Sequence, residues 1–205
     1  MKGPLANIIG LYSNVPKYGI ITDEQKRWFI EELIAADKER CEKALIVCLH
    51  HSPYSADMNH SSSLPMISFL NEAFETANVR PDIVFSGHVH NYQRFCKKYT
   101  EGIITPYIVA GGGGYDQLHP IASVGNEWYT DEHPLLKDVR LENYCDTNHG
   151  FLKITIEKRH NGMFLRGEYF AINESEETNN LTEPVLADIF EIRIGKRGGV
   201  RSYCC

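Results

Sequence analysis

The 205-residue sequence is 42% hydrophobic and 23% charged, which is typical of a globular protein built as one domain. Its 21 basic and 27 acidic residues give a net charge of −6, which argues against nucleic-acid binding through a broad positive surface. No run approaches the roughly 18 apolar residues of a membrane span, and the first residues lack the apolar core of a signal peptide. We therefore expect no membrane partner, and a cytoplasmic location if the chain is complete.

The first half of the chain alternates strand-like and helix-like segments. A capping box begins at Thr22 and ends at Gln25, and apolar residues then recur at helical spacing. A second capped helix is expected from Leu64, with Pro65 in its first turn, where proline is tolerated. The segments expected in order are a strand at 5–11, a helix at 23–39, a strand at 44–49, a helix from 64 and a strand at 82–85. This order is typical of an α/β sheet.

The second half has the character of an antiparallel sheet. Strands are expected at 95–100 and 103–110, followed by a run of four glycines that permits close backbone approach. Residues 115–148 have the pattern of a long irregular loop. Asn161-Gly162 predicts a hairpin between strands at 151–157 and 163–172, a polar loop covers 174–180, and a last strand is expected at 188–194. We expect one domain at 1–194 and a flexible tail at 195–205.

The most informative stretch is Gly87-His88-Val89-His90, directly after the apolar strand at 82–85. In an extended chain, residues two apart point to the same face, so the two imidazoles can share one space. Imidazole is the commonest protein metal ligand, and open α/β sheets place their sites at strand ends. A surface loop that carries two histidines by chance is the alternative.

Three more histidines bear on this hypothesis. His51 closes the strand at 44–49, and neighbouring parallel strands lie about 4.8 Å apart, so His51, His88 and His90 can surround a common centre. His50 is expected to face the other way by strand alternation. His60 lies in a polar loop, either as an idle surface residue or as a proton donor that reaches over the site.

Together these residues resemble the C-terminal half of a calcineurin-like metallophosphoesterase, closest to the purple acid phosphatase branch. The resemblance rests on His51-Ser52-Pro53, on His60, and on the segment from Gly87 to Arg94. The strand and glycine run at 106–114 and the segment His149-Gly150-Phe151-Leu152 resemble later parts of the same family.

This resemblance implies a four-layer fold, a β-sandwich flanked by helices, with a dinuclear metal centre at the strand ends. It implies that His51 and His88 bind one metal ion and His90 the other. By the same resemblance, His60 acts on the leaving group or on the phosphate. Nitrogen ligands are compatible with Zn, Fe or Mn, in divalent or trivalent form.

The sequence also departs from the family pattern. The family supplies its aspartate and asparagine ligands upstream, but the only aspartates before His50 are Asp23 and Asp37, both in the expected helix. Asp131-Glu132-His133, Gly125-Asn126-Glu127 and Asn148-His149 contain similar fragments in the wrong order, and we interpret them as coincidences. The chain is therefore expected to be truncated at its N-terminus.

Two functions remain open from the sequence. The first is a metal-dependent hydrolase of phosphate monoesters or diesters, of which this chain carries the C-terminal half of the site. The second is a catalytically inactive metal-binding or interaction module derived from the same fold. In either case, an exposed sheet edge predicts some self-association.

Overall fold

The structure, a computed structural model, describes residues 1–13, 21–115, 117–122, 133–172 and 183–195. The helices are α1 (Asp23–Asp37), α2 (Leu64–Ala77) and the short 3₁₀ helix η2 (Pro134–Leu136). The strands are β1 (Ala6–Gly10), β2 (Ala44–Cys48), β3 (Ile83–Ser86), β4 (Tyr92–Lys98), β5 (Ile104–Ala110), β6 (Val139–Cys145), β7 (His149–Arg159), β8 (Gly162–Ile172) and β9 (Val185–Ile194). In this part of the chain, no helix is long and apolar enough to cross a membrane.

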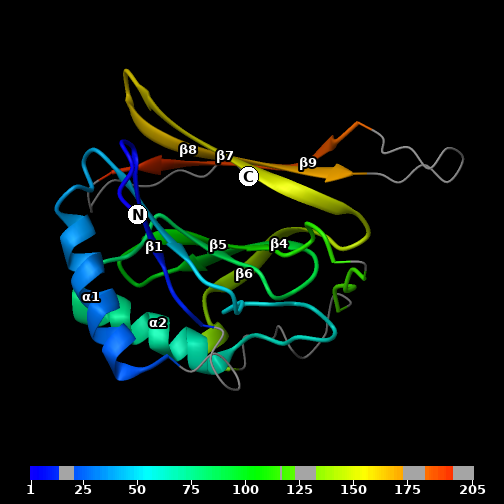
Figure 1. Cartoon of the computed structure of the whole chain (residues 1–205), viewed down its shortest axis with the longest axis horizontal. Coiled ribbons are helices and arrows are strands. Elements are labelled where there is room, and N and C mark those ends of the chain that lie inside the picture. Colours follow the sequence, from blue (N-terminus) through cyan, green and yellow to red (C-terminus); the bar gives the residue numbers. More distant parts are fainter. Residues whose placement is uncertain (14–20, 116, 123–132, 173–182, 196–205) are drawn as a thin grey trace, which may run out of the picture.

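The strands form two sheets that lie face to face. The larger sheet has the order β1-β2-β3-β5-β4-β6, in which β1, β2, β3 and β5 are parallel, while β4 runs antiparallel to β5 and β6. The smaller sheet is the antiparallel meander β7-β8-β9. Figure 1 shows α1 and α2 on one side of the larger sheet and the smaller sheet on the other.

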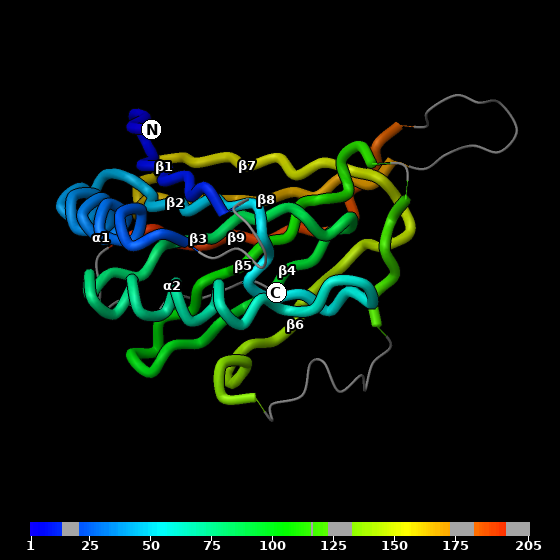
Figure 2. Tube along the Cα trace, turned by 60° about the horizontal axis from the view of Figure 1, so that its bottom comes forward, coloured from blue at the N-terminus to red at the C-terminus, as the bar shows by residue number. Residues whose placement is uncertain are grey.

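Each face of the larger sheet has its own hydrophobic core. The helix side buries Phe29 and Leu33 of α1 and Leu70 and Phe74 of α2 against the central strands. On the opposite side, β2, β3 and β5 contribute apolar side chains that pack against Leu165 and other residues of the smaller sheet. A continuous apolar strand such as β2 is the pattern expected of a strand covered on both faces. Figure 2, turned from the first view, shows α1 and α2 next to each other, with α1 nearer to β1.

Both helices begin where the sequence predicts. The Thr22 side chain accepts a hydrogen bond from the Gln25 backbone N–H at 3.3 Å, which is the N-cap half of a capping box, while the Gln25 side chain bonds the backbone of Tyr12. The Ser63 hydroxyl accepts from the Met66 backbone N–H at 3.4 Å and precedes the first turn that contains Pro65. Asn78 ends α2 in the left-handed conformation.

The α/β architecture expected from the sequence is therefore present, with two differences. The described residues form three layers, and no described helix covers the outer side of the smaller sheet, where the four-layer expectation placed one. Residues 115–148 are also not wholly irregular, because they contain η2 and the edge strand β6. Strand β6 was missed because it is half-polar along its whole length.

Several expectations fall on residues outside the described ranges. These are part of the 115–148 segment, the loop at 174–180 and all but the first residue of the tail at 195–205. The hairpin around Asn161-Gly162 is present, and its strands pair in register from His149 with Ile172 to Arg159 with Gly162.

Candidate active site

The candidate site lies where two neighbouring parallel strands end. Beyond β2 and β3, the Leu49 N–H donates to the Phe85 carbonyl and the Gly87 N–H donates to the His50 carbonyl, both at 3.0 Å. These two hydrogen bonds hold the residues after each strand side by side. The two histidine-bearing segments therefore reach the same edge of the sheet, where open α/β folds place their sites.

The segment after β3 is tightly turned rather than extended. The Val89 N–H donates to the Gly87 carbonyl at 2.7 Å, and the Asn91 N–H donates to the Val89 carbonyl at 2.9 Å. His88 adopts a left-handed backbone with φ of 65°, which is sparsely populated for residues other than glycine. Such conformations cost on the order of 1–3 kcal/mol and cluster at functional sites.

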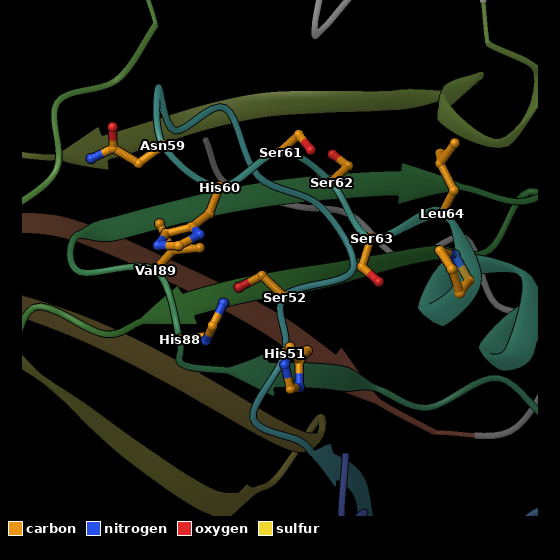
Figure 3. A pocket seen from close by; sticks show the side chains of 11 residues that line it. His51, Ser52, Asn59, His60, Ser61, Ser62, Ser63, Leu64, His88 and Val89 are labelled. Atoms are coloured by element: carbon orange, nitrogen blue, oxygen red, sulfur yellow. The ribbon is translucent and has the colours of Figure 1, made fainter. Parts of the chain in front are cut away.

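Three of the predicted site residues line one pocket of about 390 Å³. The rings of His51 and His88 have centroids 4.6 Å apart, and those of His60 and His88 are 4.7 Å apart. Figure 3 shows these three side chains around the pocket, with Ser61, Ser62 and Ser63 of the segment before α2 along its rim. His60 therefore belongs to the site and is not an isolated surface residue.

His90 lies next to this pocket rather than in its lining. Its ring is 4.2 Å from the Tyr115 ring and 4.5 Å from the ring of His119, by centroids. His119 is in turn 5.1 Å from His60. The imidazoles thus form a continuous cluster that runs from His51 through His88, His60 and His119 to His90.

The expectation for His50 was wrong. Its Nε2 lies 3.1 Å from Nδ1 of His88, and its ring centroid is 5.0 Å from that of His88. The alternation rule does not apply here because β2 ends at Cys48, so His50 is outside the pleated strand. His50 is therefore part of the cluster.

Two buried serines support the ends of the strands. The Ser13 hydroxyl, after β1, accepts the backbone N–H groups of His50 and His51 at 3.0 and 3.1 Å and lies 3.3 Å from Nδ1 of His51. The Ser52 hydroxyl donates to the Gly87 carbonyl at 2.9 Å. These contacts fix the position of His51 relative to the turn that carries His88.

The cluster favours neutral imidazoles. Burial, followed by the neighbouring rings of His51 and His60, lowers the pKa of His88 to about 4. Burial and the adjacent His50 also lower the pKa of His51. A neutral imidazole carries the nitrogen lone pair that a metal ion requires.

Sequence reasoning missed two residues of this cluster, Asp57 and His119. The Asp57 side chain is fully buried, and its Oδ2 lies 3.5 Å from Nδ1 of His119. Asn91 connects them, because its Nδ2 lies 3.3 Å from Asp57 Oδ1 and 2.9 Å from the His119 carbonyl. The only signal in the sequence was their position in the two segments expected to be loops.

Of the three fragments with misplaced family patterns, only His133 and Asn148-His149 are among the described residues. Asp131 and Asn126 lie outside the described residues. The His133 ring caps η2 by accepting the Leu135 N–H, and Nε2 of His149 lies 2.6 Å from the Tyr115 carbonyl oxygen.

The donor chemistry of the cluster suits a metal that prefers nitrogen. Nδ1 of His90 is buried without a hydrogen-bond partner among the described residues. In the same described part of the chain, no group of three or more His, Cys, Asp or Glu side chains is arranged to hold a metal ion. The side chains therefore fit such an ion in chemical type, and water or substrate oxygens would have to complete its coordination.

Comparison with known proteins places the fold. No family model matches the sequence, and no curated protein matches it. Among solved structures, the chain is similar to one titled "GAP50 the anchor in the inner membrane complex of Plasmodium", with a TM-score of 0.52 and 14% identity. It is also similar to one titled "Structure of PhoD", with a TM-score of 0.52 and 13% identity. The chain has part of a metallophosphoesterase fold.

The alignments cover nearly all of this chain but only part of the matched proteins. They include 93% of this chain and 50% of the Plasmodium protein, and 90% of this chain and 35% of PhoD. The chain thus spans about half and about a third of their lengths. The resemblance that began with the histidine motif is confirmed at the level of the metallophosphoesterase fold, and identities this low establish the fold alone.

Proposed function

We propose that this chain carries the C-terminal half of a phosphoesterase centre and contributes to metal-dependent hydrolysis of phosphate esters. The observation that carries the proposal is the gathering of His51, His60 and His88 around one pocket at the carboxyl ends of β2 and β3. Kinship with metallophosphoesterases in fold supports it.

His51 and His88 would hold one metal ion, and His90 would hold the other. Zn, Fe or Mn ions at such a site polarise a phosphate ester and make a hydroxide available near neutral pH. His51 and His88 are suited to this role because their lowered pKa values favour the neutral imidazole. Ser13 also fixes the position of the His51 ring. The oxygen ligands that the family supplies upstream are absent from this sequence, so the paired site is incomplete.

His60 would act on the substrate rather than on a metal ion. Its backbone N–H donates to the buried carboxylate of Asp57 at 2.8 Å, which fixes the start of the serine-rich rim. The ring lies beside His88 in the same pocket and can reach the phosphate or the leaving-group oxygen. Protonation of a leaving group by a positioned side chain is the usual role of such a residue.

Metal analysis of the purified chain and of two variants tests the assignment. We expect His88→Ala to lower the content of bound Zn²⁺ or Mn²⁺ more than His133→Ala, because His133 caps η2 instead of lining the pocket. Hydrolysis of an aryl phosphate should be slow in the unmodified chain and should be lost in His90→Ala. Equal metal content in the two variants would contradict the assignment.

A non-catalytic module is the second candidate, favoured by two observations. The described residues contain no group of three or more side chains arranged to hold a metal ion. One structurally similar protein is described as an anchor in the inner membrane complex of Plasmodium. Absence of any turnover of phosphate esters by this chain, in Zn²⁺ or Mn²⁺ at saturating concentration, would support this second function.

A further inference from the structure

The pair formed by Asp57 and His119 is unusual because a fully buried carboxylate faces an imidazole at the edge of the site. Asp57 Oδ2 accepts the backbone N–H groups of Asn59 and His60 at 3.0 and 2.8 Å and lies 3.5 Å from Nδ1 of His119. The Asp57 side chain is 0% exposed and that of His119 is 13% exposed. The carboxylate therefore fixes the backbone of one histidine and faces the ring of another.

The main chain around His119 is equally well fixed. Its N–H donates to the His90 carbonyl at 3.0 Å, and its carbonyl accepts from Nδ2 of Asn91 at 2.9 Å. Asn91 is in turn held by Gln93, whose Nε2 donates to Asn91 Oδ1 at 2.8 Å. His119 is thereby tied to the histidine motif itself, although it lies about thirty residues later in the chain.

The carboxylate determines which nitrogen of His119 is available. An anionic oxygen near Nδ1 favours the tautomer with its proton on Nδ1, so Nε2, on the far side of the ring, keeps its lone pair. A lone pair does not bind a phosphate oxygen, which is also an acceptor, but it does bind a metal ion. Nδ1 of His119 makes no hydrogen bond among the described residues, but it lies 3.5 Å from this carboxylate, and metal-ligating histidines commonly have a carboxylate behind their other ring nitrogen.

We propose that His119 is a ligand of the metal ion assigned to His90, and that Asp57 is the positioning residue that orients it. The rings of His90 and His119 are 4.5 Å apart by centroids, and the buried Nδ1 of His90 has no hydrogen-bond partner among the described residues. The inference rests on the proposed phosphoesterase function. It supplies one nitrogen to the metal position that lacks the upstream ligands of the family.

Zn²⁺ titration of the metal-free chain against a chromophoric chelator tests this inference without an activity assay. Wild type should bind two equivalents, and His119→Ala and His119→Gln should weaken one equivalent while leaving the other unchanged. Asp57→Asn should weaken the same equivalent by about 10- to 100-fold, the usual effect of losing a carboxylate behind a metal-bound histidine. His160→Ala, at an exposed position in the hairpin turn, is the matched control and should titrate as wild type.

The outcomes separate the two proposals. If wild type binds no Zn²⁺, the proposed function fails and the inference fails with it. If wild type binds Zn²⁺ and His88→Ala weakens binding while both His119 variants match His160→Ala, only the inference is overturned. Circular dichroism and thermal unfolding show whether each metal-free variant is folded. Each titration is run below the variant's unfolding midpoint, so that loss of folding is not mistaken for loss of a ligand.

Discussion

The side chains of the four residues that follow His90 point alternately to the two faces of the larger sheet. Asn91 and Gln93 are 0% exposed and connect the histidine motif to the segment that carries Asp57. Tyr92 and Arg94 point to the smaller sheet, where both contact Asp188 of β9. Strand β4 begins at Tyr92, so this alternation is the ordinary consequence of the pleat.

Asp188 of β9 accepts hydrogen bonds from residues of the larger sheet, and the stability that these bonds contribute is sensitive to acid. Arg94 Nε donates to it at 2.7 Å, Tyr92 Oη at 2.6 Å and Asn143 Nδ2 at 2.8 Å. Burial raises the pKa of this carboxyl group, but the hydrogen bonds from Arg94 and Tyr92 outweigh burial and hold the pKa below its ordinary value of 3.8. Its stabilising contribution is therefore present above pH 3.8 and is lost as the pH falls through the lowered pKa.

We predict that Asp188→Asn lowers the free energy of unfolding by about 3–5 kcal/mol at pH 7, because it leaves the buried Arg94 charge unpaired. The variant should lose less stability than wild type on acidification below pH 3.8, since its side chain no longer titrates. Urea unfolding across this pH range measures both effects. Glu183→Gln, at an exposed position, is the control, and an Asp188→Asn curve that parallels it would refute the role of the ion pair.

The role of His60 is tested by comparing leaving groups. If the proposed phosphoesterase activity is obtained, His60→Ala should reduce kcat about 100- to 10,000-fold on alkyl phosphates, whose leaving groups need a proton, and should affect activated aryl phosphates less. Metal content should be unchanged, because His60 is not assigned as a ligand. Equal losses on both substrates would instead indicate that His60 binds the phosphate.

At the residue scale, the sequence predicted the site only in part. His51 and His88 line one pocket, because short motifs at the ends of adjacent parallel strands have little freedom in where they lie. His90, which was expected to share their centre, lies beside the pocket, and His60, whose place the sequence left open, lines it. His119 depends on a long-range contact with Asp57, which lies 62 residues earlier, and no local pattern encodes such a pair. His50 was misplaced because the end of β2 could not be located to a single residue.

At the element scale, the first glycine after β5 holds the histidine turn in place. A Cβ atom on Gly111 would lie 1.9 Å from the Val89 carbonyl oxygen and 2.8 Å from its carbon, both of which are backbone atoms. The Gly111 N–H donates to the Asn91 carbonyl at 3.0 Å. The close backbone approach predicted from the glycine run is therefore made by this residue, directly beside His88 and His90.

We predict that Gly111→Ala displaces the turn between the two histidines. The expected cost is about 1–3 kcal/mol of unfolding free energy, the usual effect of overpacking, with a weaker affinity for Zn²⁺. Gly114→Ala is a matched control in the same run, because a Cβ atom at this position would have nothing within 4 Å. Chemical unfolding and Zn²⁺ titration of the pair give the comparison, and identical behaviour would contradict the prediction.

The same scale shows which elements sequence patterns can and cannot find. The first residues of both helices were predicted correctly, and the end of α1 within two residues, because helix caps are local hydrogen bonds. Strand β6 was missed because it pairs only with β4, at the sheet edge, and its side chains alternate weakly between buried and exposed. Its register with β4 also shifts between Arg94 and Phe95, so regular alternation is lost there.

At the scale of the whole molecule, β1 and not the apolar strand β2 forms the edge of the larger sheet nearest the start of the chain. Strand β2 is paired on both sides, with β1 and β3, and is not exposed. One edge of the sheet is β6 and the other is β1. Residues 1–3 cover part of the β1 edge, since the Met1 carbonyl accepts the Ile8 N–H at 2.9 Å and the Gly3 N–H donates to the Ala6 carbonyl at 2.7 Å. Gly10, at the end of β1 nearest the site, is exposed.

We propose that the chain self-associates through this edge. A strand edge offers unpaired backbone groups to another chain, and natural proteins often block such edges with lysine. Gly10→Lys should therefore shift the chain toward monomer, and it introduces no clash because nothing lies within 4 Å of a Cβ atom at this position. Sedimentation velocity at several protein concentrations measures the effect. Thr100→Lys adds the same charge at an exposed turn between β4 and β5 and is the control. An equal shift in this control would show that charge alone opposes association. A wild-type chain that stays monomeric at every concentration would exclude the edge as an interface.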